Sequence, residues 1–278
     1  MLGQQAMPQA SASAGGQRLR LLTYNMQVGI STARYHHYLT RGWQHVLPHA
    51  LRSENLNRIG TLIGDYDIVA LQETDGGSLR SGFVNQVEYL AHRADFPYWY
   101  QQRNRNLGRL GQHGNGILTR YEPEILEDHK LPGTLPGRGA IVARFGHPSE
   151  PLLLIAVHLS LGQRSQMRQL AYLRELVANY RHVVIMGDMN TRQQRLLLDS
   201  PLQHGDFHVF EDEYHTFPSW RPVRGLDHIL VSRTLKVHGI EVMDFPVSDH
   251  LPMAVEVELP AAVGSLLNPA APVAMDRR

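Results

Sequence analysis

Short apolar runs recur along the whole chain, and their patterning predicts β-strands. The runs are rich in Leu, Ile and Val, and they cover residues 19–24, 67–71, 116–120, 140–145, 152–158, 182–186, 227–232, 236–242 and 253–259. Some are continuously apolar, as expected of strands that are buried on both faces, whereas MAVEVEL at 253–259 alternates and predicts one solvent-facing side. This pattern predicts a mixed α/β fold with large sheets.

Three segments between these runs carry apolar residues at helical spacing. They span 56–63, 83–91 and 167–180, and each repeats apolar residues three or four positions apart. Ser81 and Ser165 are the expected N-caps of the second and third helices, because a serine hydroxyl accepts hydrogen bonds from first-turn amides. Two packed sheets with helices on their outer faces would use these elements.

The chain divides into a long central part and two short ends. No change of composition, long linker or internal repeat interrupts residues 18–260, so we expect a single domain there. Residues 1–17 are expected to form a flexible leader, and residues 261–278, rich in Pro and Ala, a loose tail. The leader lacks the features of a signal peptide, and no run approaches the ~20 apolar residues of a membrane span. We therefore expect a cytoplasmic protein without a transmembrane segment.

Charge and cysteine content narrow the chemistry. The 27 Lys and Arg residues nearly balance the 26 Asp and Glu residues, and a net charge of +1 provides no overall field for a polyanion. Any preference for phosphate must therefore be local. Because the chain contains no cysteine, disulfides, thiolate zinc sites and cysteine nucleophiles are excluded. The sequence also lacks G-x-S-x-G, H-E-x-x-H and P-loop motifs.

Polar residues interrupt the apolar pattern where five of the predicted strands begin or end. They are Asn25, Glu73, His158, Asp188 with Asn190, and Asp249 with His250. Each alone fits a turn or a buried hydrogen bond, but neighbouring strand ends would bring them together at a sheet edge, where α/β proteins bind ligands. Carboxylates and amides without thiolates suit Mg²⁺ better than Zn²⁺, and they suit phosphoryl chemistry. Gly187, directly before Asp188, is expected to let the chain turn.

Seven motifs stand in an order that points to a family. They are TYN (23–25), LQET (71–74), GNGILTR (114–120), VHLS (157–160), GDMN (187–190), LDHIL (226–230) and SDH (248–250). With them the chain resembles the endonuclease/exonuclease/phosphatase superfamily, which includes DNase I and the sphingomyelinases. LQET alone is weak, whereas GDMN followed by a C-terminal SDH is specific. The resemblance implies a metal-dependent phosphoric ester hydrolase. It also implies a DNase I-like four-layer α/β/β/α sandwich, in which two mixed sheets pack face to face.

The resemblance implies a metal site at the ends of the two sheets. Glu73 would be the principal ligand, Asn25 its neighbour in the metal sphere, and Asp249 a further metal-binding or orienting carboxylate. The implied cofactor is Mg²⁺, which Mn²⁺ could replace.

The remaining matched positions would carry the reaction. Asp188 would orient or deprotonate the attacking water, and Asn190 would contact the phosphate or the metal beside it. His250 would contact the scissile phosphate, with Asp227 fixing its tautomer, and His158 would be a second phosphate donor or the acid near the leaving group. The physical argument agrees, because a carboxylate that holds an imidazole raises its pKa and keeps it protonated against a phosphate.

His158 separates the chain from the abasic-site endonuclease branch, which usually has tyrosine at this position. DNase I and the sphingomyelinases share the histidine, and an acid commonly supports it in DNase I-like enzymes. The nearest matching position here is Asn115, so an amide is expected to orient His158.

Arginines supply candidate phosphate contacts outside the motifs. Arg103 and Arg105 lie in the stretch 98–121, which carries four arginines and no acid and is either a phosphate-binding segment or a solvated loop. Arg138 is either a phosphate contact or a member of an ion pair. The histidines within 31–53 are too irregularly spaced for zinc, and they predict a substrate-facing rim or a partner surface.

These observations predict a Mg²⁺-dependent phosphodiesterase that hydrolyses a nucleic acid or a phospholipid headgroup by in-line attack of water. A phosphomonoesterase acting on a sugar or inositol phosphate is an alternative, because the arginine-rich stretch could bind a dianion. A catalytically inactive binding protein of the same fold is disfavoured, since every catalytic and metal position is filled. No protein partner is indicated by the sequence.

Overall fold

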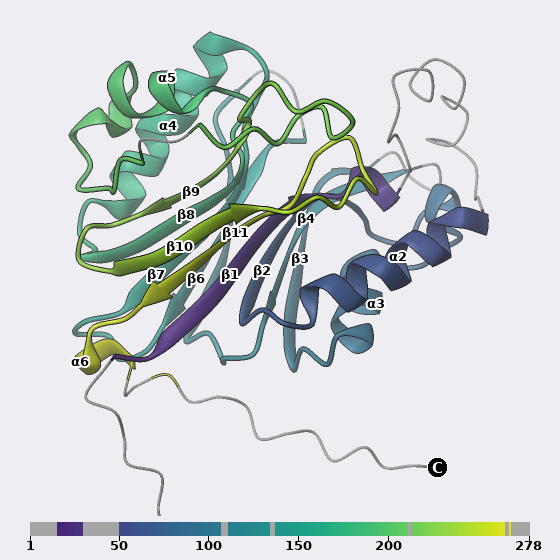
Figure 1. Ribbon diagram of the computed structural model, residues 1–278, viewed down its shortest axis with the longest axis horizontal. Helices are drawn as coiled ribbons and strands as arrows, with labels where there is room; N and C mark the ends of the chain where they lie inside the picture. Colours follow the sequence, from purple (N-terminus) through teal and green to yellow (C-terminus); the bar gives the residue numbers. More distant parts are fainter. Residues whose placement is uncertain are drawn as a thin grey trace, which may run out of the picture.

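The computed structural model describes residues 16–29, 50–106, 111–133, 137–210, 213–264 and 267, and these form four layers (Figure 1). Two β-sheets pack face to face in the middle, and helices cover both outer faces. The architecture follows from the sequence, because strands with two apolar faces need a covering layer on each side.

The first sheet has six strands. They are β1 (Arg18–Asn25), β2 (Ile68–Asp75), β3 (Tyr98–Asn106), β4 (Gln112–Thr119), β10 (Lys236–Val242) and β11 (Met253–Glu258). Their order in space is β10-β11-β1-β2-β4-β3. The neighbours β1 and β2 are parallel, and the other pairs are antiparallel.

The second sheet has five strands in the order β5-β6-β7-β8-β9. They are β5 (Ile125–Lys130), β6 (Gly139–Phe145), β7 (Leu152–His158), β8 (His182–Asp188) and β9 (Asp227–Val231). Here β7 and β8 are parallel, and the other pairs are antiparallel. Each sheet is therefore mixed and has a parallel pair in its interior.

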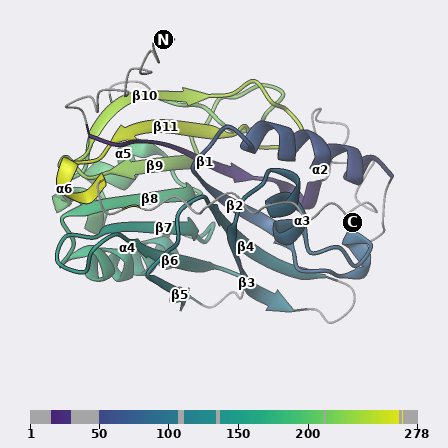
Figure 2. The same ribbon diagram turned by 90° about the horizontal axis from the view of Figure 1, so that it is seen from below.

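Helices cover the two sheets on opposite sides of the molecule (Figures 1 and 2). The helices α2 (Ala50–Ile63) and α3 (Gln86–Arg93) pack on the first sheet, and α4 (Gln163–Val177) and α5 (Gln193–Leu198) pack on the second. Shorter helices are η1 (Gln27–Gly29), η3 (Leu79–Ser81), η4 (Pro201–His204) and α6 (Ala261–Gly264).

Three layers of buried apolar side chains hold the sandwich together. The layer between the sheets contains Leu21 and Ile68 from one sheet and Ile141, Ala156 and Met186 from the other, all of them fully buried. The two outer layers lie between each sheet and its helices. The predicted four-layer α/β/β/α sandwich with two mixed sheets is confirmed.

All nine predicted strands are present, and two further strands escape the apolar pattern. Both β3 and β5 lie at the edge of a sheet, where one side of the strand has no neighbour and polar residues are tolerated. The solvated-loop alternative for 98–121 is wrong, because 98–106 and 112–119 are the paired strands β3 and β4.

The expected N-caps of two helices are wrong. The side chain of Asn85 caps α3 by accepting hydrogen bonds from two first-turn amides, whereas Ser81 belongs to η3. Ser165 lies inside α4, which begins after Gly162. Helical spacing locates a helix, but a boundary between neighbouring polar residues depends on which side chain reaches the free amides.

Gly187 does not mark a turn, because β8 continues through it to Asp188. Its backbone φ is +147°, a value that residues other than glycine rarely adopt. A Cβ atom there would stand 1.9 Å from the carbonyl oxygen of Val157, its register partner on β7. Glycine is therefore required by close contact between two strands.

The two ends of the chain fall largely outside the described residues, which exclude 1–15, 265–266 and 268–278. Within the described part, the amide of Gly16 donates to Glu258 Oε1 at 3.2 Å, and Val263 of α6 is buried in the central core. The division into leader, domain and tail stays a prediction.

Among the described helices, none is both long enough and apolar enough to cross a membrane. The expected cytoplasmic location stays a prediction.

Candidate active site

The ends of strands from both sheets meet in one buried polar cluster. Asn25 ends β1 in the first sheet, and its Nδ2 donates a hydrogen bond to Asp188 Oδ2 at the end of β8 in the second sheet, at 3.0 Å. Register places Asp188 between two neighbours, His158 on β7 and Asp227 on β9. The hydrogen bond between Asn25 and Asp188 thus joins two residues that are 163 positions apart in the chain.

A local distortion presents Glu73 to this cluster. The pairing of β2 with β4 shifts register between Leu71 and Thr74, and Glu73 inside the bulge has a φ of +54°. Such a bulge redirects a side chain that a regular strand would point elsewhere. The side chain is 35% exposed, and its Oε1 lies 4.0 Å from His158 Nε2. Within the described part of the chain, no hydrogen bond occupies this carboxylate.

Both oxygens of the Asp188 carboxylate are fixed. Oδ2 accepts from Asn25, and Oδ1 accepts from the backbone amide of Asn190 at 2.9 Å. The side chain of Asn190 donates in turn to the carbonyl oxygen of Leu159 at 3.0 Å, and its φ is +49°. The carboxylate is therefore held in one orientation at the end of a rigid strand.

Two imidazoles flank this carboxylate. His158 Nε2 is 3.4 Å and His250 Nε2 is 4.0 Å from Asp188 Oδ2. Burial alone would raise the pKa of Asp188. The charge on His250 and the imidazole of His158 outweigh burial, and they hold the pKa below its ordinary value. Asp188 is therefore ionised at neutral pH.

His250 is paired with a fully buried carboxylate. Its Nδ1 donates to Asp227 Oδ2 at 2.7 Å, and the hydroxyl of Thr216 donates to the same oxygen at 2.5 Å. The ring of Phe217 packs against the imidazole with 4.9 Å between centroids. The expected role of Asp227 agrees with this contact, since donation from Nδ1 turns Nε2 toward Asp188.

The pKa of His250 follows from the same contacts. Burial alone would lower it. The negative charges of Asp227 and Asp188 outweigh burial and raise the pKa well above its ordinary value. The site therefore contains an imidazolium at neutral pH, although the ring is almost completely buried.

One group of buried side chains in the cluster has the spacing that could hold a metal ion. Asp188, Asp227 and His250 offer ligand atoms that lie within 4.8 Å of one another. One oxygen of Asp227, Oδ1, is buried and has no hydrogen-bond partner among the described residues. The Nδ1 of His250 is already bonded to Asp227, however, so this trio is first of all a hydrogen-bonded pair beside a carboxylate.

The predicted metal ligands are only partly brought together. Glu73 and Asn25 both reach the cluster, through their contacts with His158 and Asp188 respectively. Asp249 is buried next to His250, and its Oδ1 accepts a long 3.5 Å hydrogen bond from Ser248. A metal-binding role for these three residues stays a prediction.

The residue behind His158 is an arginine, and the expectation of an amide is wrong. Arg138 Nη1 contacts His158 Nδ1 at 3.1 Å. Asn115 instead donates from Nδ2 to the carbonyl oxygen of Gly139 and to Gln102 Oε1, at 3.3 and 3.4 Å. Its buried Oδ1 has no hydrogen-bond partner among the described residues.

The described arginine of β3, Arg103, makes no contact with the polar cluster among the described residues. Arg103 is exposed on β3 opposite Gly114, and no contact among the described residues joins it to either imidazole. Arg105 lies in β3, but its side chain is not part of the described structure, and the histidines of 30–49 lie outside the described residues. Phosphate binding by Arg103 and Arg105 stays a prediction.

Two contacts of the site carry no motif. Thr216 and Arg138 hold Asp227 and His158 respectively, and each lies in an irregular segment. Sequence reasoning assigned no role to Thr216 and a different role to Arg138. A clue existed for the arginine, since it directly precedes the strand that pairs with β7.

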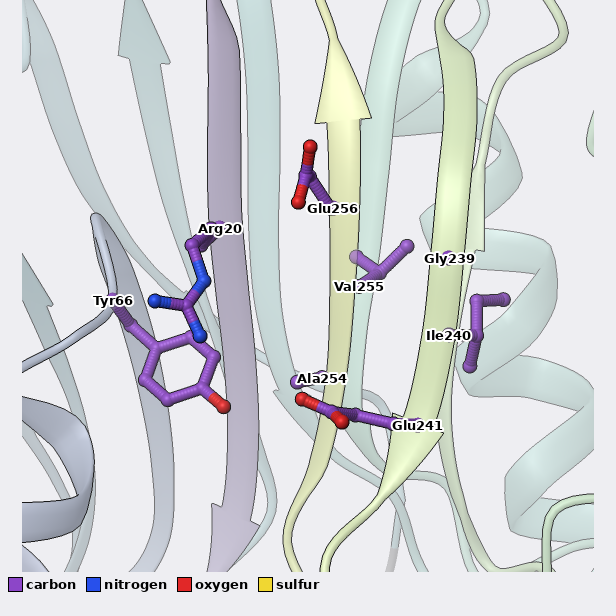
Figure 3. Close-up of a pocket in the computed structure, with 8 residues that line it drawn as sticks. All are labelled: Arg20, Tyr66, Gly239, Ile240, Glu241, Ala254, Val255 and Glu256. Atoms are coloured by element: carbon purple, nitrogen blue, oxygen red, sulfur yellow. The ribbon is translucent and has the colours of Figure 1, made fainter.

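A separate cleft of about 230 Å³ lies over β1, β10 and β11, away from this cluster (Figure 3). Arg20 stacks on the ring of Tyr66 there, and Glu241 and Glu256 line the opposite side. None of its lining residues belongs to the polar cluster, so the cleft is not the candidate active site.

Comparison with known proteins agrees with the geometry. The sequence profile of the Endonuclease/Exonuclease/phosphatase family matches residues 22–250. Among curated proteins, none matches the chain. Solved structures with similar folds include an endonuclease/exonuclease/phosphatase family protein from Bacteroides thetaiotaomicron, which is 17% identical with a TM-score of 0.64 over 88% of this chain and 99% of that one.

Two further structures illustrate the range of similar folds. A mannosyl-6-phosphatase from Bacteroides thetaiotaomicron is 18% identical, with a TM-score of 0.60 over 86% of this chain and 99% of its own. TDP2 from D. rerio, complexed with a single-strand DNA product, is 16% identical, with a TM-score of 0.62 over 87% and 99%. At these identities the likeness concerns the fold, whereas the profile match spans most of the chain. The chain therefore belongs to the endonuclease/exonuclease/phosphatase family, whose members are phosphoric ester hydrolases.

Proposed function

We propose that this protein is a Mg²⁺-dependent phosphodiesterase that hydrolyses its substrate by in-line attack of water. The observation that supports this most directly is the environment of Asp188. Its carboxylate is ionised and held in one orientation, and it lies between the imidazole rings of His158 and His250, where strands of both sheets end. A base beside hydrogen-bond donors is the arrangement that water attack on a phosphate needs.

Asp188 orients the water and takes its proton. Its lowered pKa keeps it ionised, and its two hydrogen-bond donors prevent rotation of the carboxylate. In-line attack tolerates little error in the position of the nucleophile, so a base at the end of a rigid strand suits it. Asn190 contributes by fixing Asp188 through its backbone amide, and its side chain would contact the phosphate or the metal ion beside it.

His250 donates a hydrogen bond from Nε2 to a non-bridging phosphate oxygen. Asp227 keeps the ring charged and turned the right way, because it accepts from Nδ1 at 2.7 Å. A charged donor in a buried site stabilises the negative charge that develops in the transition state more strongly than it would in water.

Glu73 would hold the metal ion, together with Asn25 and Asp249. The partly exposed carboxylate of Glu73 is free to bind a cation, and the oxygen-rich donor set suits Mg²⁺, with Mn²⁺ as a substitute. When bound, the ion supplies positive charge that neutralises a phosphate oxygen.

The balance of charge favours a diester over a monoester. A phosphate monoester is a dianion and needs additional cationic contacts. Among the described residues, the cations at the cluster are His250 and Arg138, and the latter contacts His158. Beside the proposed metal ion, the charged ring of His250 is then the cation of this pair that faces the substrate, and it suits a diester better than a dianion.

A substrate panel tests the proposal. We expect the full chain to hydrolyse bis-p-nitrophenyl phosphate with Mg²⁺, to lose this activity in EDTA and to regain it with added Mg²⁺. Plasmid nicking against release of headgroups from sphingomyelin or phosphatidylglycerol vesicles identifies the source of the diester. Asp188→Asn should reduce turnover by about 10²–10⁴-fold, the usual contribution of a general base. Activity that survives exhaustive chelation, or faster hydrolysis of p-nitrophenyl phosphate than of the diester, contradicts the proposal.

A further inference from the structure

The two imidazoles beside Asp188 have opposite charges behind them. His250 donates from Nδ1 to the carboxylate of Asp227 at 2.7 Å, whereas His158 has the guanidinium of Arg138 at 3.1 Å from its Nδ1. The two rings therefore cannot carry their protons in the same way, although both direct Nε2 toward the same carboxylate oxygen.

The direction of the arginine contact is settled by chemistry. A guanidinium has five N–H donors and no acceptor, so a hydrogen bond between Arg138 and His158 requires the imidazole nitrogen to accept. Nδ1 of His158 must then be unprotonated, and the single ring proton must sit on Nε2. No carboxylate within the described part of the chain pairs with Arg138 and offsets its charge.

The surroundings of Nε2 agree with a proton there. Nε2 lies 3.4 Å from Asp188 Oδ2 and 4.0 Å from Glu73 Oε1, so a proton on this nitrogen faces two carboxylates. The atom is buried and has no hydrogen-bond partner among the described residues. A buried N–H without a partner is costly, and a phosphate oxygen that accepts from Nε2 would satisfy it.

Strand register explains how Arg138 reaches this position. Gly139, the first residue of β6, is the register partner of His158, and Arg138 directly precedes it. Asn115 does not compete for the ring, because its amide donates to Gly139 and Gln102. The guanidinium therefore stands on the far side of the ring from Asp188.

We propose that Arg138 is a positioning residue that fixes the proton of His158 on Nε2. His158 then serves as a fixed hydrogen-bond donor to a phosphoryl oxygen, and it keeps its proton throughout the reaction. It does not protonate the leaving group: the P–O bond breaks, the departing oxygen takes a proton from solvent water, and Asp188 receives the proton of the attacking water. This inference rests on the proposed diester hydrolysis.

The location of the proton can be measured without turnover. In ¹⁵N-labelled, metal-free protein, long-range ¹H–¹⁵N spectra distinguish a protonated from an unprotonated ring nitrogen, and His158→Gln identifies the signals of His158 by their loss. We expect protonated Nε2 and unprotonated Nδ1 at neutral pH. Protonated Nδ1 in the wild-type protein overturns the proposal, whatever the enzyme hydrolyses.

Two substitutions of the arginine test its part in this. Arg138→Met removes the donor at similar length, and we expect Nδ1 of His158 to gain a proton. Arg138→Lys keeps a group that can only donate, and it should restore the proton to Nε2. Arg168→Met, an exposed position on α4, is the matched control and should leave the spectrum unchanged. Unchanged His158 signals in Arg138→Met overturn the role of the arginine.

Kinetics separate a fixed donor from an acid. We expect Arg138→Met to lower kcat/KM by about 10–100-fold, the range found when the hydrogen-bond partner behind a metal-ligating histidine is removed. In His158→Ala the fold-loss should be equal for aryl diesters with good and poor leaving groups. A loss that grows as the leaving group becomes more basic overturns the proposal. Absence of any hydrolysis would contradict the proposed function, while the spectra would still test Arg138.

Discussion

Replacing Gly187 by alanine should destabilise the protein and move His158 away from Asp188 in the active site. The change adds one methyl group inside β8, directly before Asp188. The added Cβ would stand 1.9 Å from the carbonyl oxygen of Val157 and 2.9 Å from its carbonyl carbon. Both atoms belong to the backbone of the neighbouring strand, so no side-chain rotation can relieve the contact.

The size of the effect follows from two contributions. A non-glycine residue held at a φ of +147° costs about 1–3 kcal/mol of backbone strain. Relieving the contact requires β7 and β8 to separate by more than roughly 1 Å, which loses about two strand hydrogen bonds at about 1 kcal/mol each. We expect unfolding free energy to fall by about 3–5 kcal/mol, which lowers Tm by about 10 °C for a domain of this size.

Urea and thermal unfolding followed by circular dichroism measure this loss. Gly239→Ala is the matched control, because Gly239 also lies in a strand but a methyl group added to it would meet only open space. It should change stability by less than about 0.5 kcal/mol. Any Gly187→Ala protein that remains folded should be inactive, since separation of the strands moves His158 away from Asp188. A variant with wild-type Tm and activity would refute the reasoning.

Three further outcomes follow from the electrostatics of the site and its neighbours. Asp227→Asn removes a charge that raises the pKa of His250 against the effect of burial, so the alkaline limb of the kcat/KM profile should move to lower pH; identical limbs would contradict the assigned pairing. Glu73→Gln should leave stability within about 0.5 kcal/mol, because the side chain has no hydrogen bond among the described residues, yet abolish the rise in Tm that saturating Mn²⁺ should give the wild type; an equal rise in both proteins would remove Glu73 from the metal site. Burial lowers the pKa of His228 below its ordinary value of 6.5. Below pH 6.5 the imidazole is therefore protonated in the unfolded chain before it is protonated in the folded protein, and the unfolding free energy falls as the pH drops. His228→Asn should therefore flatten the dependence of unfolding free energy on pH between about pH 5 and 7, and parallel curves would exclude this histidine as the cause.

Residues at the ends of central strands were predictable because two signals coincide there. Asp188 follows a continuous apolar run and Asn25 a largely apolar one, and a segment buried on both faces leaves its end for polar chemistry. The edge strand β3 was not predictable from apolar patterning, because it contains polar residues such as Gln101 and Gln102. β3 is the last strand of its sheet and pairs with β4 on one side only, and polar residues are tolerated in such an edge strand.

Contacts made by irregular segments were beyond the reach of patterning. Thr216 donates to Asp227 from eleven residues away, and Arg138 reaches His158 through the register of β6 with β7. Neither contact can be predicted from hydrophobic periodicity or from a sequence motif. An isolated glycine is also ambiguous in sequence. Gly187 suggested a turn, but it is required because β7 and β8 approach each other closely there.

The hydrogen bond between Asn25 and Asp188 has a mechanical consequence. Since it joins a residue of one sheet to a residue of the other, the spacing between the sheets sets where the base stands relative to groups on β1 and β2. The side chains that maintain this spacing, such as Leu21 and Ala156, are remote from solvent and carry no chemistry. Their volumes nonetheless set the distance between the sheets. A methyl group gained or lost in this layer would therefore change the position of Asp188 relative to the groups on β1 and β2.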